Sequence, residues 1–307
     1  MRIRAAVGTT RGRRTIRLAL GALFVAGAAV AAEVQEVEPN SGPQTATPLP
    51  AATIGVGDIH PVGDRDFWKV SDAIEGDQIF ALLQTALSSS GNTDAVMVAY
   101  DTNAAPINDD DNDGPGLAPA MAGDVVPVSG DVYYEIFDLN DDGVITPYRL
   151  FQMIADPATS VPETEPNDTA ATANAVAGQS LATGTLPDNS DVDFFAVTLA
   201  SGDELAVVLD RDPDNSGFLV GSLVDIMDTD GTTVLAAGDV ISGDAHGVGP
   251  ITAAGDGTYY VRVRRSSGTD DDYRIAFLTV APEAGALVSA LASVGVLGAL
   301  RKRRSAR

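Results

Sequence analysis

Apolar and polar residues alternate along much of the chain between residues 33 and 280. One example runs from Leu205 to Leu209. A second runs from Tyr259 to Arg264 and places tyrosine and valines on one face and arginines on the other. A period of two predicts β-strands with one buried face. Glycine, aspartate and asparagine cluster between these segments, as is typical of hairpin loops. Since no segment of this region keeps a helical period, the pattern predicts an all-β fold.

The sequence also repeats itself. A shift of 127 positions superimposes residues 36–70 on 163–197 without a gap, and Tyr133-Tyr134 and Tyr148-Arg149 match Tyr259-Tyr260 and Tyr273-Arg274 further on. The matched pairs include Glu36/Glu163, Glu38/Glu165, Pro39/Pro166, Asn40/Asn167, Gly57/Gly184, Asp64/Asp191, Asp66/Asp193 and Phe67/Phe194. A repeat of this length is a domain. We therefore expect two tandem antiparallel β-sandwiches, over residues 33–158 and 159–280.

Both ends of the chain are basic and differ from the body. Residues 1–32 carry six arginines before an apolar run that is too short to span a bilayer, which predicts a cleavable signal peptide. Residues 281–307 contain a Pro-Glu pair, a small and apolar run, and five basic residues among the last seven. This pattern predicts a hydrophobic helix that is either a sorting tail or a plain C-terminal membrane anchor.

The tail resembles the PEP-CTERM sorting signal of Gram-negative bacteria, although Ala284 stands where that motif has its second proline. The resemblance implies an exosortase-like envelope protease as a partner that removes the tail. It also implies a final location at the cell envelope, the cell surface or the extracellular matrix. Contact with the membrane would then be transient and made only through the tail.

The body between residues 33 and 281 holds 42 acidic and eight basic residues. A body this acidic excludes binding to nucleic acid through its phosphates and favours the binding of cations. The sequence has no cysteine, which excludes disulfides, thiolate chemistry and cysteine-ligated metals.

Two acidic segments in the second copy are candidates for a metal site. In "ETEPND" (163–168), an extended backbone places Glu163 and Glu165 on one side, and Pro166 favours that extended conformation. A second knot of acids follows in "LPDNSDVDFF" (186–195), and the nearest basic residue is Arg211. Such carboxylates repel one another unless they are protonated or bind a cation, and calcium takes six to eight oxygen ligands. The alternative is that the acids cap turns and face water.

These motifs, with the later Gly-x-Tyr-Tyr-x-Val and the closing Tyr-Arg-Ile, resemble the bacterial pre-peptidase C-terminal domain. That domain is similar to the collagen-binding domains of clostridial collagenases. The resemblance implies a jelly-roll β-sandwich with calcium ligands at Glu163, Glu165, Asn167, Asp168, Asp188, Asp191 and Asp193. In the first copy it implies ligands at Glu36, Glu38, Asn40, Asp64 and Asp66. Since Ser41 and Pro61 stand there in place of Asp168 and Asp188, we expect a weaker first site.

A further acidic loop has part of the EF-hand spacing. Asp138, Asn140 and Asp142 stand at its first, third and fifth positions, but Arg149 stands at the twelfth, where an EF-hand needs glutamate. The loop lies between two strand-like runs. We expect a hairpin loop that either binds calcium weakly or forms an unliganded Asp-Gly turn.

The sequence contains none of the common motifs for zinc hydrolases, serine hydrolases or phosphate-binding loops. The first hypothesis is therefore a non-catalytic, calcium-stabilised, exported protein that acts as a binding or adhesion module for an extracellular polymer or protein. The alternatives are an accessory or targeting partner of a separate secreted peptidase or other hydrolase, and a hydrolase without a recognisable motif. Trp68, Tyr134 and Tyr260 are candidates for a binding face, with burial in the core as the alternative.

Overall fold

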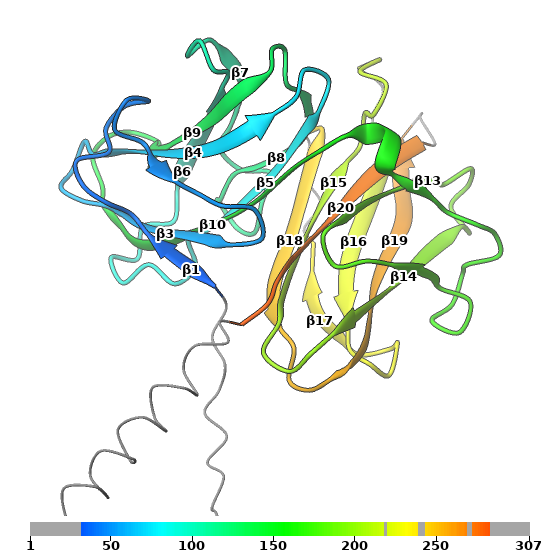
Figure 1. Ribbon diagram of the computed structural model, residues 1–307. Helices are drawn as coiled ribbons and strands as arrows, with labels where there is room; N and C mark the ends of the chain where they lie inside the picture. Colours follow the sequence, from blue (N-terminus) through cyan, green and yellow to red (C-terminus); the bar gives the residue numbers. More distant parts are fainter. Residues whose placement is uncertain (1–31, 218–219, 239–242, 269–271, 283–307) are drawn as a thin grey trace, which may run out of the picture.

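The computed structural model describes residues 32–217, 220–238, 243–268 and 272–282 (Figure 1). The chain is all-β in this part, with one short 3-10 helix at Pro157–Thr159, so the expected fold class is confirmed. The predicted signal peptide (1–32) and C-terminal tail (281–307) lie outside the described residues, except for Ala32, Ala281 and Pro282. In the part that is described, no helix has the length and apolar character needed to cross a membrane.

The first sandwich consists of two five-stranded sheets. Its inner sheet faces the second sandwich and has the order β1 (Glu33–Gln35), β3 (Ile54–Ile59), β10 (Ile145–Ala155), β5 (Gln78–Gln84) and β8 (Ala120–Val125). Its outer sheet has the order β2 (Thr47–Pro48), β4 (Arg65–Ala73), β9 (Gly130–Asp138), β6 (Ala95–Tyr100) and β7 (Pro106–Asp110).

The second sandwich repeats this arrangement. Its inner sheet has the order β11 (Val161–Pro162), β13 (Ser180–Thr185), β20 (Asp272–Val280), β15 (Glu204–Asp210) and β18 (Ala245–Thr252). Its outer sheet has the order β12 (Asn174–Val176), β14 (Val192–Leu199), β19 (Gly257–Gly268), β16 (Val220–Met227) and β17 (Val234–Ala237).

The two sandwiches have the same topology, because adding ten to each strand number of the first gives the strand order of the second. Strands β3 to β10 follow the two-sheet order of a jelly roll, 3-10-5-8 against 4-9-6-7. The strand pairs of both sandwiches are antiparallel, as expected, except at one edge of each sheet. The short strands β1, β2, β11 and β12 each pair in parallel with a neighbour, because the incoming segment runs beside β3 or β13 and then crosses to the other sheet.

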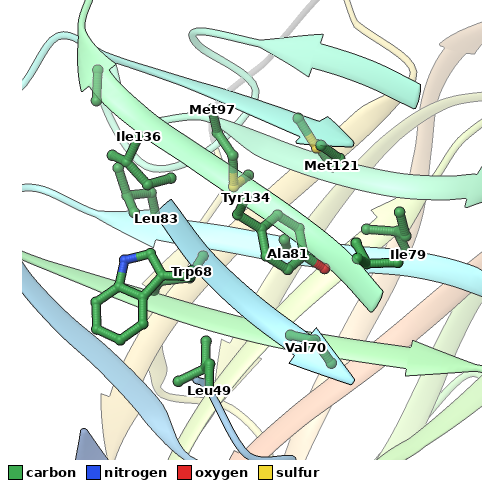
Figure 2. Packing of buried hydrophobic residues seen from close by; sticks show 14 of the residues in the cluster. Leu49, Trp68, Val70, Ile79, Ala81, Leu83, Met97, Met121, Tyr134 and Ile136 are labelled. Carbon is green, nitrogen blue, oxygen red and sulfur yellow. The ribbon is translucent and has the colours of Figure 1, made fainter. Parts of the chain in front are cut away.

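Each sandwich encloses its own hydrophobic core. In the first, Trp68 and Tyr134 are fully buried and pack with residues of both sheets, including Leu83 and Met97 (Figure 2). These two aromatic side chains are therefore part of the core and are unavailable as a binding face. In the second sandwich, Tyr260 is half-buried.

A third apolar cluster lies between the two inner sheets and joins the sandwiches. It includes Phe80 and Leu82 from β5 and Ala206 and Val208 from β15, all fully buried. The expectation of one buried face was thus wrong for the segment that begins at Leu205. Strand β15 is buried on both faces, because Leu205, Val207 and Leu209 pack inside the sandwich while the alternate residues pack against the first sandwich.

Two arginines cross this interface in a reciprocal arrangement. Arg149 of β10 donates two hydrogen bonds of 2.8 Å to the Glu204 carboxylate of β15. Arg274 of β20 donates to the Gln78 side chain of β5. Since Arg149 and Arg274 are repeated residues, and Gln78 and Glu204 both begin the corresponding strands, the two sandwiches meet through equivalent surfaces. This is the arrangement of a two-fold symmetric dimer within one chain.

The sheet register corrects one match between the copies. Tyr134 pairs with Trp68, whereas Val261 pairs with Phe195, the residue that corresponds to Trp68. Tyr134 therefore corresponds to Val261, so the match of Tyr133-Tyr134 to Tyr259-Tyr260 was wrong by one residue. That match would place the buried Tyr134 on the opposite face of its strand, because a shift of one residue exchanges the two faces.

Candidate metal centre

Two equivalent groups of carboxylates lie at corresponding places in the two sandwiches. Among the described residues, they are the groups in which at least three acidic or histidine ligand atoms lie within 4.8 Å of one another. We call them centre one (Glu36, Glu38, Asp66) and centre two (Glu163, Glu165, Asp193). The structure thus brings together three of the predicted ligands in each copy.

The fold brings these acids together from two sheets. The glutamates lie in the segment that leaves the edge strand of the inner sheet and crosses toward the outer sheet. The Glu163 backbone N–H still donates to the Thr183 carbonyl of β13, 2.8 Å away. Asp193 is the second residue of β14 in the outer sheet, and the next backbone N–H, that of Phe194, donates to the Asn167 carbonyl. The crossing segment is therefore fixed to both sheets at each centre.

Hydrogen bonds to backbone and amide groups orient the glutamates. In centre two, Glu163 Oε1 accepts from the Thr185 backbone N–H at 2.6 Å, and Glu165 Oε2 accepts from the Asn167 backbone N–H at 2.9 Å. The Asn167 side-chain amide donates to Glu163 Oε2 at 3.3 Å. In centre one, Glu36, Glu38 and Asn40 make the same set of contacts, with the Asp58 backbone N–H in place of that of Thr185.

Asn40 and Asn167 are completely buried beside these carboxylates. The Asn40 amide contacts Glu36 in one orientation, and Glu38 and Asp66 in the other. Asn167 Oδ1 is buried and has no hydrogen-bond partner among the described residues. Each centre thus has a buried asparagine amide in contact with its carboxylates.

The aspartate of each centre is also completely buried. Asp193 Oδ2 accepts a hydrogen bond of 2.5 Å from the Tyr273 hydroxyl, but its Oδ1 has no hydrogen-bond partner in the described part of the chain. Asp66 accepts from the Tyr148 hydroxyl at 2.7 Å, and that hydroxyl accepts from Trp68 Nε1. A buried carboxylate oxygen without a donor is costly unless a proton or a cation satisfies it.

The electrostatics of both centres favour a bound positive charge. Burial and the neighbouring Glu36 raise the pKa of Asp66 to about 9. Burial and the Glu163 carboxylate raise the pKa of Asp193 to about 8. Without a cation, the buried aspartate of each centre therefore holds a proton more tightly than a free aspartate does. A metal ion would take the place of that proton.

The other predicted ligands lie at different distances from the centres. Asp191 is partly exposed, and burial followed by the charges of Glu165 and Glu163 raises its pKa, which places it beside centre two. Asp168 is exposed, and its negative charge also raises the pKa of Asp191. Asp188 is not part of the group, because its carboxylate accepts from the Ser190 backbone N–H and hydroxyl in its own turn. In the first sandwich, Asp64 accepts from the backbone N–H groups of His60 and Arg65.

The predicted EF-hand-like loop connects β9 of the outer sheet to β10 of the inner sheet, so the expectation of a hairpin loop was wrong. Asp138 is buried, and its Oδ2 accepts from the backbone N–H groups of Asp142 and Gly143 at 3.0 and 2.9 Å. Its Oδ1 accepts from the Asn92 amide. The side chains of Asn140 and Asp142 are exposed. In this conformation Asp138 closes the turn with hydrogen bonds, as an Asx turn does.

Sequence reasoning missed the tyrosine and the glycine of each centre. Tyr148 and Tyr273 hold the buried aspartates, and Gly57 and Gly184 leave room for the tyrosine ring and the first glutamate. The sequence repeat did contain a signal for them, because the tyrosine and the glycine stand at equivalent positions in the two copies. Their role depends on contacts between strands that are distant in sequence, which the repeat alone does not reveal.

Gly184 provides a test of how tightly centre two is packed. A Cβ atom at this position would clash with the Tyr273 hydroxyl and lie 2.7 Å from Glu163 Oε2. Gly184→Ala is therefore expected to lower the free energy of unfolding by about 1–3 kcal/mol, as overpacking of a core does. Gly255→Ala is the control, because a Cβ atom there meets nothing within 4 Å. Equal urea midpoints for the two variants would contradict the packing described here.

The comparisons with known proteins place a family match on the second sandwich. The model of the family described as "Bacterial pre-peptidase C-terminal domain" matches residues 191–265, which include Asp191, Asp193 and most of β14 to β19. No curated protein matches the chain.

Solved structures show weak overall similarity. The pre-peptidase C-terminal domain of collagenase from Bacillus anthracis has 18% identity and a TM-score of 0.29, with 38% of this chain and 99% of that chain covered. The CUB1-EGF-CUB2 domain of human MASP-1/3 has 11% identity and a TM-score of 0.21, with 72% and 95% covered. The family match covers part of the second sandwich, including strand β14, which carries the buried Asp193 of centre two.

Proposed function

We propose that this protein is a non-catalytic, exported binding module whose two sandwiches are each stabilised by one calcium ion. The observation that carries the proposal is the repeated centre. In both copies a buried aspartate and two glutamates converge, and in centre two an oxygen of Asp193 has no hydrogen-bond donor among the described residues. Such a group is stabilised by a cation with several oxygen ligands.

Calcium fits the chemistry of the donors. Each centre offers carboxylate oxygens, which are hard ligands of the kind that calcium prefers. An ion bound there would connect the crossing segment, held by Glu163 and Glu165, to Asp193 in the outer sheet. Calcium would therefore hold the two sheets of each sandwich together at one end.

The expected gain in stability is moderate. Extracellular calcium modules bind the ion with dissociation constants of about 10⁻⁴–10⁻³ M. At ten times the dissociation constant, one site contributes about 1.4 kcal/mol to the free energy of unfolding. Two sites acting together would make the protein stable outside the cell and weaker where calcium is scarce.

Thermal unfolding of the protein in EDTA and in increasing calcium tests this proposal. We expect the melting temperature to rise by several degrees and to saturate below about 10 mM calcium. Glu163→Gln/Glu165→Gln should remove about half of that rise. Asp188→Asn is the matched control, because this acid lies outside centre two, and it should keep the full rise. A melting temperature that does not respond to calcium would reject the proposal.

The ends of the chain support the proposed location and partners, and the family match supports only an extracellular location. The basic, apolar leader supports export, and the tail supports sorting by an exosortase-like protease at the envelope of a Gram-negative bacterium. The module would then bind an extracellular polymer or protein. Mass spectrometry of the exported protein tests the sorting step, since an intact C-terminus at Arg307 would contradict it.

A further inference from the structure

A cavity of about 600 Å³ lies next to centre two. Its wall comes from the segment after β11, from β13, from the turn after β15 and from the start of β20. This volume lies within the range of pockets that hold small organic ligands. The fold thus provides a hollow beside the metal centre of the second sandwich.

The cavity and centre two share two residues. Glu163 and Glu165 belong to the carboxylate group of the centre and also line the cavity. An ion at the centre would therefore lie at the edge of the cavity. Hydrogen bonds from Tyr273, Thr185 and Asn167 hold one oxygen of each of the three carboxylates. The group therefore offers fewer free oxygens than the six to eight ligands of calcium, so the ion can accept oxygens from a molecule in the cavity.

The remaining polar groups of the wall are suited to hydroxyl groups. Asp214 and Asp272 provide carboxylates that accept hydrogen bonds, and Thr183 provides a hydroxyl. The Asp214 carboxylate is oriented by the Ser216 backbone N–H, 3.1 Å away. Arg274 also lines the wall, and its guanidinium is held at the interface by Gln78 and Asp210. Sugar hydroxyls both donate and accept, so they can satisfy carboxylates and a guanidinium together.

The negative charge of the cavity favours neutral ligands over charged ones. Four carboxylates and one arginine line the wall, and the whole body is strongly acidic. An anionic ligand would be repelled even after calcium has bound. A basic ligand would compete with the ion for Glu163 and Glu165. A neutral ligand rich in hydroxyl groups meets neither obstacle.

We propose that this cavity binds a neutral saccharide, with sugar hydroxyls completing the coordination of the calcium ion at centre two. The proposal rests on the proposed function, since it needs the ion at that centre. The saccharide would be held on one side by the ion and on the other by Asp214, Asp272 and Arg274. The binding module would thus recognise a neutral glycan.

Calorimetry of the whole protein with defined probes tests the proposal. The probes are neutral gluco-, manno- and galacto-trisaccharides, tri-lysine and tri-galacturonate, each titrated in saturating calcium and in EDTA. We expect at least one neutral trisaccharide to bind in calcium and none to bind in EDTA. Glu163→Gln should abolish this binding. Glu36→Gln is the matched control, because it changes the equivalent residue of centre one, and it should leave saccharide binding unchanged.

A variant of the cavity separates the sugar site from the metal site. Asp214 is exposed and lies outside centre two, so Asp214→Ala is expected to fold and to bind calcium as the wild type does, while saccharide binding weakens at least tenfold. If calcium does not bind to the wild type, the proposed function fails. If calcium binds but no neutral trisaccharide does, or if only tri-lysine or tri-galacturonate binds, the saccharide proposal alone is overturned.

Discussion

Arg149→Ala is expected to lower the free energy of unfolding by about 3–5 kcal/mol. The guanidinium makes two hydrogen bonds of 2.8 Å to Glu204 across the interface between the sandwiches, and both side chains are only 10% exposed. Removing the arginine leaves the Glu204 carboxylate buried without its cation. Urea unfolding, followed by circular dichroism, measures the change.

Two further variants show whether the effect comes from the broken ion pair. Arg149→Leu/Glu204→Leu removes both charges and should recover most of the lost stability, because replacing both partners with apolar groups leaves no unpaired charge. Lys69→Ala is the control at a more exposed pair, since the Lys69 and Asp131 side chains are each 31% exposed, and it should cost about 1 kcal/mol or less. Equal losses for Arg149→Ala and Lys69→Ala would contradict the buried interface.

The same interface gathers aspartates from both sandwiches. Asp210 of β15 is buried next to Gly123 of the first sandwich, and the Asp113 carbonyl accepts from the Gly247 backbone N–H of the second at 2.8 Å. Burial raises the pKa of Asp210 to about 7, against the nearby positive charge of Arg274. An aspartate with a raised pKa therefore lies where the two sandwiches meet.

Two aspartates of the first sandwich also have raised pKa values. Burial and the charges of Asp110 and Asp244 raise the pKa of Asp113 to about 7, with Arg211 opposing the shift. Burial also raises the pKa of Asp124 to about 6, with the Asn108 side chain acting in the opposite direction. The interface therefore binds more protons than the unfolded chain between about pH 4 and pH 7.

Asp210→Asn is accordingly expected to stabilise the protein at pH 8 by about 2–3 kcal/mol and to have little effect at pH 4. The folded-state pKa is higher than the unfolded value of 3.8, so the wild type loses this contribution as the pH rises through about 7. The asparagine amide is neutral, like the protonated acid, so the variant keeps this contribution to stability at high pH. Urea unfolding at the two pH values in saturating calcium measures the difference.

The exposed Asp142→Asn is the control for the loss of one negative charge. It should change the unfolding free energy by similar small amounts at both pH values. If Asp210→Asn is less stable than the wild type at pH 8, then the attraction to Arg274 outweighs burial and the account of the interface fails.

The repeat and the alternation were sufficient to predict the all-β fold and the place of the centres. The shift of 127 positions matches Glu36 with Glu163 and Asp66 with Asp193. Both copies therefore keep the same spacing between the crossing segment and the outer strand. The pairing of the two sandwiches could not be predicted in this way. An apolar residue such as Val208, which lies between the two inner sheets, has two interpretations in the sequence. It can be an irregularity in a strand with one buried face, or it can belong to a strand that is buried on both faces.

Single residues were harder to place than segments. Asp188 belongs to the acidic motif but turns back to Ser190, because a short Asp-x-Ser turn satisfies its carboxylate locally. Tyr273 lies 80 residues from Asp193 in the chain, and only the strand order of the jelly roll brings its hydroxyl to that carboxylate. Local sequence therefore predicts which acids are available, whereas the topology decides which of them share a centre.

A calorimetric titration of the purified protein with calcium tests the central claim most directly. The account predicts two ions per chain for the wild type, one for Glu36→Gln/Glu38→Gln and one for Glu163→Gln/Glu165→Gln. The variant that combines all four changes should bind none, while its circular dichroism spectrum in buffer still shows a β fold. Two ions bound to the combined variant, or no calcium bound to the wild type, would contradict the two centres as metal sites.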